Sequence, residues 1–186
     1  MKKTSKLTFT VLLALFVYAG TARAQIYMLE SSNVRFFSDA LIEDITATTT
    51  SAQGLVNVAD KTFSFRVPIK TFEFAKDLMK EHFNENYMES EKHPYGTFKG
   101  SIVGNFDFTK NGVYEVTARG VLDVHGVPQE RSIPAKLFVE GSVVRLESVF
   151  MVKLVDHDIE IPQIVFQNIA EEIEVTIKSD LVPYKK

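Results

Sequence analysis

The densest group of chemically capable residues lies between Glu81 and Tyr87, in the order Glu-His-Phe-Asn-Glu-Asn-Tyr. His82 and Glu85 are three positions apart, so on a helix they share a face and could ligate a metal ion or form an acid–base pair. We favour the structural alternative, in which these side chains cap a helix and pin the following loop by hydrogen bonds to the backbone. The cluster whose role stays open comprises Glu81, His82, Asn84, Glu85 and Asn86.

No motif elsewhere strengthens a catalytic hypothesis. His93, His125 and the Asp-His-Asp triplet at 156–158 could supply distant ligands, but their spacing supports no metal site. The sequence lacks the patterns H-E-x-x-H, H-x-x-E-H, G-x-S-x-G and Ser-x-x-Lys, and it has no glycine-rich phosphate loop. His125 precedes a glycine at the end of an alternating segment, which is more typical of a turn residue than of a base. We therefore predict that the protein has no catalytic residues, no cofactor and no metal, and that it is not an enzyme.

Composition limits the classes of protein further. The chain has 186 residues, 45% of them hydrophobic, enough for one domain with a sizeable core. It contains no cysteine, which excludes disulfides, thiolate metal sites and a cysteine nucleophile. The formal net charge of −3 gives no reason to expect a nucleic-acid partner.

Residues 1–24 have the features of a cleaved signal peptide. Three lysines precede an apolar run from Leu7 to Ala19, and Ala22-Arg23-Ala24 fits the small-x-small cleavage pattern. The run is shorter than the ~20 residues that a transmembrane helix needs. We therefore expect an exported, periplasmic domain over residues 25–186 that does not span the membrane. Loss of Lys2, Lys3, Lys6 and Arg23, with no acidic residue, would change the net charge from −3 to −7.

The remaining chain alternates apolar and polar residues with a period of two, which predicts antiparallel strands with one buried face. The clearest segments are 62–69, 98–108, 114–124, 133–139, 144–154 and 173–177, and weaker ones lie at 26–31, 34–38 and 44–58. Turn signals at 110–112, 125–128 and 140–142 separate several of them. About eight amphipathic strands predict an all-β fold, closed as a barrel or packed as a sandwich.

One segment departs from this pattern. Residues 72–88 contain no glycine or proline, and Phe74, Leu78, Met79 and Phe83 follow helical spacing. We expect one inserted α-helix over about 72–88.

Glycines fall on the inward face of two predicted strands. Gly96, Gly100 and Gly104 alternate with Phe98, Ile102 and Phe106, and Gly120 lies on the inward face of the next strand. Such glycines either let strands coil sharply at barrel corners or leave space beside a ligand. Both interpretations remain open from the sequence.

Three stretches resemble the YceI-like family, in the same order over nearly all of residues 25–186. They are 78–90 (LMKEHFNENYMES) with His93-Pro94 and 97–100, then 120–127 (GVLDVHGV), and then 156–162 (DHDIEIP). The extended form of the first stretch is typical of Bacteroidetes-type members. The resemblance implies an exported, lipocalin-like, eight-stranded antiparallel barrel with a hydrophobic tunnel, which in some members holds a polyisoprenoid, an isoprenoid quinone or a related lipid. The resemblance implies no catalytic residues.

On this basis we expect a periplasmic protein that holds a polyisoprenoid or other long apolar lipid in its tunnel. The predicted lining is Phe63, Phe65, Leu78, Met79, Phe83, Phe98, Ile102, Val116, Leu146 and Phe150. Two alternatives stay open: an envelope structural or interaction protein with a filled barrel, and a metal-dependent enzyme around His82 and Glu85. A homodimer is compatible with the sequence, which does not define the oligomeric state.

Overall fold

The computed structural model describes residues 26–162 and 169–185, and most of them lie in strands. The predicted signal peptide, residues 1–24, lies outside the described residues. The strands are β1 (Ile26–Ser38), β2 (Ile45–Thr49), β3 (Gln53–Asn57), β4 (Thr62–Pro68), β5 (Glu73–Phe74), β6 (Tyr95–Val103), β7 (Gly112–Val124), β8 (Val127–Glu140), β9 (Val143–Lys153) and β10 (Glu172–Pro183). The helical segments are the 3₁₀ turns η1 (Ile69–Thr71) and η3 (Leu154–His157), the α-helix α2 (Asp77–His82) and the π-helical turn η2 (Phe83–Tyr87).

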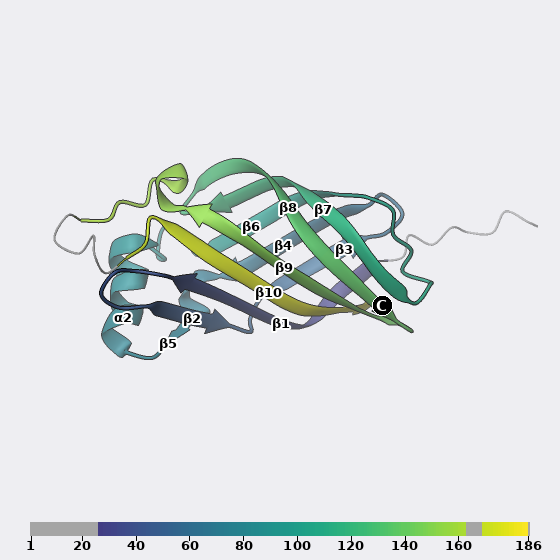
Figure 1. Ribbon diagram of the computed structural model, residues 1–186, viewed down its shortest axis with the longest axis horizontal. Coiled ribbons are helices and arrows are strands. Elements are labelled where there is room, and N and C mark those ends of the chain that lie inside the picture. Colours follow the sequence, from purple (N-terminus) through teal and green to yellow (C-terminus); the bar gives the residue numbers. More distant parts are fainter. Residues whose placement is uncertain (1–25, 163–168, 186) are drawn as a thin grey trace, which may run out of the picture.

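Eight of these strands close into an antiparallel barrel (Figure 1). The order around the barrel is β10-β9-β8-β7-β6-β4-β3-β1, and β1 pairs again with β10. The first residues of β1 pair with β3, whereas Val34–Ser38 pair with β2, so the short strands β2 and β5 continue the sheet at one end. The prediction of an eight-stranded antiparallel barrel is confirmed, and closure rather than sandwich packing removes the sheet edges.

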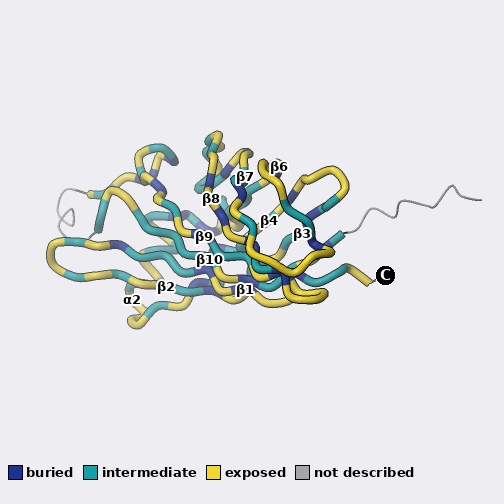
Figure 2. Tube along the Cα trace, turned by 45° about the vertical axis from the view of Figure 1, so that its right-hand side comes forward, coloured by how far each residue is buried: buried dark blue, intermediate teal, exposed yellow. Residues whose placement is uncertain are grey.

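Burial varies from residue to residue along the barrel strands (Figure 2), and the period-two pattern separates inward from outward positions. On β8 the predicted inward residues Ile133, Ala135, Leu137 and Val139 are all buried, and Lys136 between them is exposed. The closed ladder fixes this register, because a slip by one residue would turn every apolar side chain outward. Of the predicted turns, His125-Gly126 forms a two-residue hairpin loop between β7 and β8, with positive φ at both residues (56° and 75°). That is the geometry of a type I′ turn.

The glycines at the centre of β6 and β7 allow the backbones to approach each other. Gly100 and Gly120 are register partners, and a Cβ atom on Gly120 would lie 2.1 Å from the carbonyl oxygen of Lys99. A Cβ atom on Gly100 would meet the Arg119 carbonyl oxygen at the same distance. These two glycines therefore serve strand geometry and leave no space for a ligand. Gly96 differs, because the atom nearest to its Cβ position is 3.6 Å away, on Ile69.

The strand predicted to run to residue 108 ends earlier. β6 stops at Val103 because Gly104 adopts a φ of +136°, which takes the chain out of the ladder. Phe106 and Phe108 lie in the following loop, and both pack against the barrel core. The ring of Phe108 is 2% exposed and meets Tyr27 edge to face, with centroids 4.8 Å apart. These rings help to fill the interior at the β6–β7 loop.

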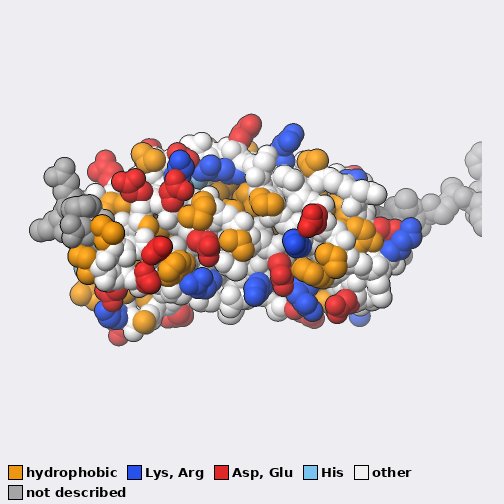
Figure 3. All heavy atoms as spheres, viewed as in Figure 1, with side chains coloured by type: hydrophobic (Ala, Val, Ile, Leu, Met, Phe, Trp, Pro, Cys, Tyr) orange, Lys and Arg blue, Asp and Glu red, His pale blue; other side chains and the backbone are white. Residues whose placement is uncertain are grey.

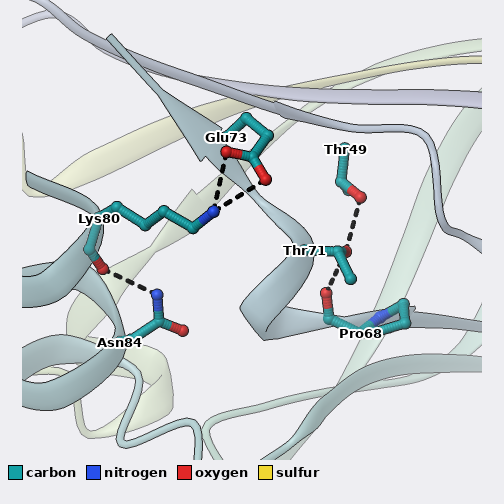
Figure 4. Close-up of polar contacts among 6 residues, drawn as sticks. All are labelled: Thr49, Pro68, Thr71, Glu73, Lys80 and Asn84. Carbon is teal, nitrogen blue, oxygen red and sulfur yellow. Dashed lines mark hydrogen bonds and ion pairs between the residues drawn. The ribbon is translucent and has the colours of Figure 1, made fainter. Parts of the chain in front are cut away.

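The helix predicted over 72–88 is shorter than expected and begins at Asp77. Glu73 and Phe74 pair with β2 instead, and Thr71 ties the preceding turn to that strand (Figure 4). The Thr71 hydroxyl donates to the carbonyl oxygen of Pro68 at 2.7 Å and accepts from the Thr49 hydroxyl at 2.7 Å. These long-range contacts override the local helical pattern, and the segment after His82 continues as a π-helical turn.

Phe83, the first residue of η2, anchors the helical insertion to the barrel end. Its ring centroid lies 5.3 Å from that of Phe36, 5.7 Å from Phe72 and 5.1 Å from Phe74. Leu78, one turn earlier, points away from this cluster and is 60% exposed. The insertion therefore depends on one aromatic ring more than on the apolar stripe of the helix.

We expect Gly120→Ala to lower the free energy of unfolding by about 1–3 kcal/mol, because its Cβ atom collides with backbone that cannot move independently. Urea denaturation followed by circular dichroism measures the change. Gly96→Ala is the matched control, since its Cβ atom has ordinary van der Waals room. Equal losses in both variants would contradict the close-approach explanation.

Phe83→Ala should lower the free energy of unfolding by about 2–3 kcal/mol. This is somewhat less than the loss expected for a fully buried phenylalanine, because the Phe83 ring contacts three others but is only half-buried. Leu78→Ala, on the adjacent turn, should change stability by no more than about 0.5 kcal/mol. The same denaturation measurement compares them. A larger loss for Leu78→Ala than for Phe83→Ala would show that the insertion is anchored differently.

Candidate ligand-binding cavity

The barrel interior contains an apolar cavity of about 490 Å³. This volume falls in the range of about 300–1,000 Å³ that is usual for small-molecule sites. Inward residues of all eight barrel strands line it, together with residues of the helical insertion. On β7 and β10 the lining residues follow the period-two pattern: Val116, Ala118, Leu122 and Val124 on β7, and Ile173, Val175, Ile177, Ser179 and Leu181 on β10.

Nine of the ten residues predicted to line a tunnel border this cavity. They are Phe63, Phe65, Met79, Phe83, Phe98, Ile102, Val116, Leu146 and Phe150. Leu78 does not, because α2 turns its side chain toward solvent. The predicted lining does not include the cavity residues of β1 and β10, although the sequence pattern predicts strands in both segments.

Few polar side chains reach the cavity. Ser148 donates from its hydroxyl to the Pro134 carbonyl oxygen at 2.7 Å, so its one O–H donor is used within the barrel. The hydroxyl oxygen of Ser179 is buried and has no hydrogen-bond partner among the described residues. Burial raises the pKa of the Tyr87 phenol, which keeps this lining side chain neutral. The cavity wall therefore offers almost entirely apolar contact.

An acidic side chain and a histidine of the lining lie at the end of the barrel that carries α2 and the β1–β2 loop (Figure 1). They are Glu43, in that loop, and His82, at the end of α2. Glu43 forms an ion pair with Lys76, directly before α2, which links the loop to the helical insertion. A polar group on a bound molecule would find complementary partners at this end.

The polar cluster around η2 divides into exposed and structural residues. Glu81, Glu85 and Asn86 are exposed. Asn84 donates from its side-chain amide nitrogen to the Lys80 carbonyl oxygen at 2.8 Å (Figure 4). The backbone carbonyl oxygen of Asn84 accepts from the Ser90 amide at 2.8 Å. The Asn84 side chain therefore bonds back into the helix, its Oδ1 has no hydrogen-bond partner among the described residues, and the contact with the following loop comes from the backbone. His82 and Glu85 belong to no group of potential metal ligands among the described residues.

A different set of side chains converges outside the cavity. Glu89, His93 and His125 bring one carboxylate oxygen and two ring nitrogens within 4.8 Å of one another. The Lys92 ammonium and, to a smaller extent, His125 lower the pKa of the Glu89 carboxyl, which holds it ionised. The spacing of these residues does not indicate a site, because they come from a loop and a hairpin turn that are distant in the chain.

The outer surface is mixed in character. On the face shown in Figure 3, acidic and basic side chains are interspersed with scattered apolar ones. Val121 and Val149 are examples of outward apolar residues, 42% and 53% exposed. Within residues 26–162 and 169–185, no helix combines the length and apolar character needed to cross a membrane.

Solved structures with the same architecture come from several bacteria. BcnA of Burkholderia cenocepacia is 14% identical with a TM-score of 0.67, over 80% of this chain and 95% of that one. A polyisoprenoid-binding domain of Saccharophagus degradans, implicated in plant cell wall breakdown, is 14% identical with a TM-score of 0.69, over 85% and 98%. The YceI protein of Campylobacter jejuni is 14% identical with a TM-score of 0.56, over 68% and 74%. At this level of identity these similarities establish the fold.

No curated protein matches the sequence. The expected Bacteroidetes-type membership stays a prediction, since none of these matches bears on it. The sequence model of the YceI-like domain, however, matches residues 27–181, which is most of the chain and includes every strand of the barrel in whole or in large part. The chain belongs to the YceI-like family.

Proposed function

We propose that this protein binds a polyisoprenoid or another long apolar lipid inside its barrel. The observation that carries the proposal is the apolar cavity of about 490 Å³, lined by inward side chains of all eight strands. A solidly packed barrel would serve a structural role equally well, but it would not retain this space. The similarity to a polyisoprenoid-binding domain of Saccharophagus degradans supports the same class of ligand.

Apolar contact alone can supply the affinity. Burial of hydrocarbon contributes about 0.8 kcal/mol per CH₂ group, or about 4 kcal/mol for each five-carbon isoprenoid unit. Aromatic rings such as Phe63, Phe65 and Phe98 add contact area without polar atoms that would need partners. The ligand needs no charge for tight binding, and the wall provides hardly any partner for one.

We place the polar end of the ligand at the α2 end of the barrel. Among the described lining residues Glu43 is an acidic side chain and His82 and Tyr87 are titratable, and all three belong to the loop and helical insertion at this end. Deeper in the cavity, the free hydroxyl of Ser179 offers one hydrogen bond, suited to an isolated oxygen atom such as a quinone carbonyl. The chemistry required is that of a carrier or a shield, and none of the lining residues that the structure describes resembles an activated nucleophile.

Export to the periplasm is part of the proposal. It rests on the signal-like sequence of residues 1–24. A long apolar molecule has low solubility in any aqueous compartment, so a protein that encloses it is of use where lipids must leave a membrane.

Protein purified without detergent should carry a lipid-sized adduct in native mass spectrometry, and the delipidated protein should bind added polyprenol or isoprenoid quinone. Ala118→Phe should weaken this binding by about tenfold or more, because the new ring occupies cavity volume that the ligand needs. Val149→Phe is the matched control: it adds the same ring on the outer face, at a residue that is 53% exposed.

The fold of both variants is checked by circular dichroism and thermal unfolding. The absence of any adduct, together with no binding of the added lipids, would refute the proposal. So would an equal loss of binding in Ala118→Phe and Val149→Phe.

A further inference from the structure

Three potential metal ligands meet on the surface next to the barrel, outside the cavity. Glu89 lies two residues after the end of η2, and His93 lies two residues before the start of β6. His125 is the first residue of the β7–β8 turn. Their ligand atoms lie within 4.8 Å of one another. We propose that Glu89, His93 and His125 form a binding site for a zinc-class divalent cation, with a further coordination position open to water.

The hydrogen bond on the far side of His125 supports this assignment. Nδ1 of His125 lies 3.1 Å from the carbonyl oxygen of His157. A carbonyl can only accept, so Nδ1 carries the proton, and in the neutral ring Nε2 presents its lone pair. A metal-ligating histidine typically makes this bond to a backbone carbonyl with its other nitrogen, which fixes its tautomer and orientation.

The Nε2 atom then faces another acceptor. It lies 3.3 Å from Oε2 of Glu89. A lone pair and a carboxylate oxygen at this distance repel unless a cation, either a proton or a metal ion, lies between them. The other oxygen of Glu89 is held by the Lys92 ammonium, so Oε2 is the one left for the ion.

His93 supplies the third donor with freedom to adjust. Neither of its ring nitrogens has a hydrogen bond within the described part of the chain, and its ring packs against His125 with centroids 4.7 Å apart. Zinc–nitrogen and zinc–oxygen bonds are about 2.0–2.2 Å long, and tetrahedral angles then place two ligands of one ion about 3.3–3.6 Å apart. The spread of up to 4.8 Å between the ligand atoms therefore has to shrink by about 1.2–1.5 Å, which requires a rotation of the His93 side chain.

The backbone holds the site in place at some conformational cost. Glu89 and His125 both have positive φ, 40° and 56°, which is uncommon for residues other than glycine. The Glu89 carbonyl oxygen accepts from the amides of Lys92 and His93, at 2.8 and 3.0 Å, which fixes this turn. Gly126 allows His93 to approach, since a Cβ atom there would lie 2.6 Å from the His93 ring.

Two histidines and one carboxylate are hard and borderline donors that suit zinc, and the chain has no thiol to compete for it. Bound zinc would cross-link the loop after η2 to the β7–β8 turn. Met88 and Val124, the neighbours of two ligands, line the cavity, so the ion would also hold that part of the cavity wall. The site itself does not depend on whether a lipid is bound.

The test uses untagged protein, stripped with a chelator, and titrates zinc against a chromophoric competitor. We expect one equivalent to bind, and His93→Gln and Glu89→Gln each to weaken binding by at least about tenfold. His82→Gln is the matched control, because it removes an exposed histidine outside the site and should leave the affinity unchanged. Zinc should also raise the thermal unfolding midpoint of the wild type but not that of His93→Gln.

A second readout separates loss of a ligand from loss of fold. The imidazole nitrogen resonances of His93 and His125 should shift on addition of zinc, whereas those of His82 should not. Failure of the wild type to bind zinc would show that a proton alone bridges His125 and Glu89 and would overturn the proposal. Equal weakening by His82→Gln and His93→Gln would do the same.

Discussion

The pairing of β1 with β10 is the interaction on which the rest of the structure depends. It joins the first and last strands along ten register pairs and converts an open sheet with two exposed edges into a closed ladder. With no cysteine in the chain, closure and core packing must supply the stability that disulfides give many small exported domains. A single bulge between Leu29 and Ser31 adjusts the strand without interrupting the closure.

Closure also decides what the interior can do. Eight strands give a barrel just wide enough to be filled by side chains or to hold one small ligand. Here Phe108 and Tyr27 pack the interior beside the β6–β7 loop, and the aromatic cluster of Phe83 covers the end that carries α2. Between them the wall carries small residues such as Ala118 and Ala135, which leave the cavity open. A molecule bound there would regain the dispersion contacts that an empty cavity forfeits.

The barrel could be predicted from the sequence because the period-two pattern is visible within each strand alone, although the strands it predicts then pair over long distances in the chain. Each strand shows its inward face by itself, and this pattern is enough to predict that residues such as Val116, Leu146 and Phe150 face the interior. The errors arise where a partner elsewhere decides the conformation. Phe74 pairs with β2 instead of extending α2. For Gly100 and Gly120, whose role the sequence leaves open, it is the close approach of β6 and β7 that decides in favour of strand geometry.

The convergence of Glu89, His93 and His125 had no signal in the spacing, since only the folded loop and hairpin bring them together. The metal site considered from the sequence uses His82 and Glu85, which are three residues apart in the chain but belong to no group of converging ligand atoms among the described residues. Local spacing predicts a site well when one helix or strand carries its ligands. It fails when loops of different strands provide them.

The central claim is that an apolar ligand lies inside the barrel, and isotope-filtered NMR on the lipid-loaded protein tests it directly. Nuclear Overhauser effects from protons of the bound lipid should reach the methyl groups of Val116 and Ile177, which line the cavity, and not those of the outward-facing Val121 and Val149. Contacts confined to the outward methyl groups would contradict the account, because the lipid would then be adsorbed on the surface of a barrel that does not admit it.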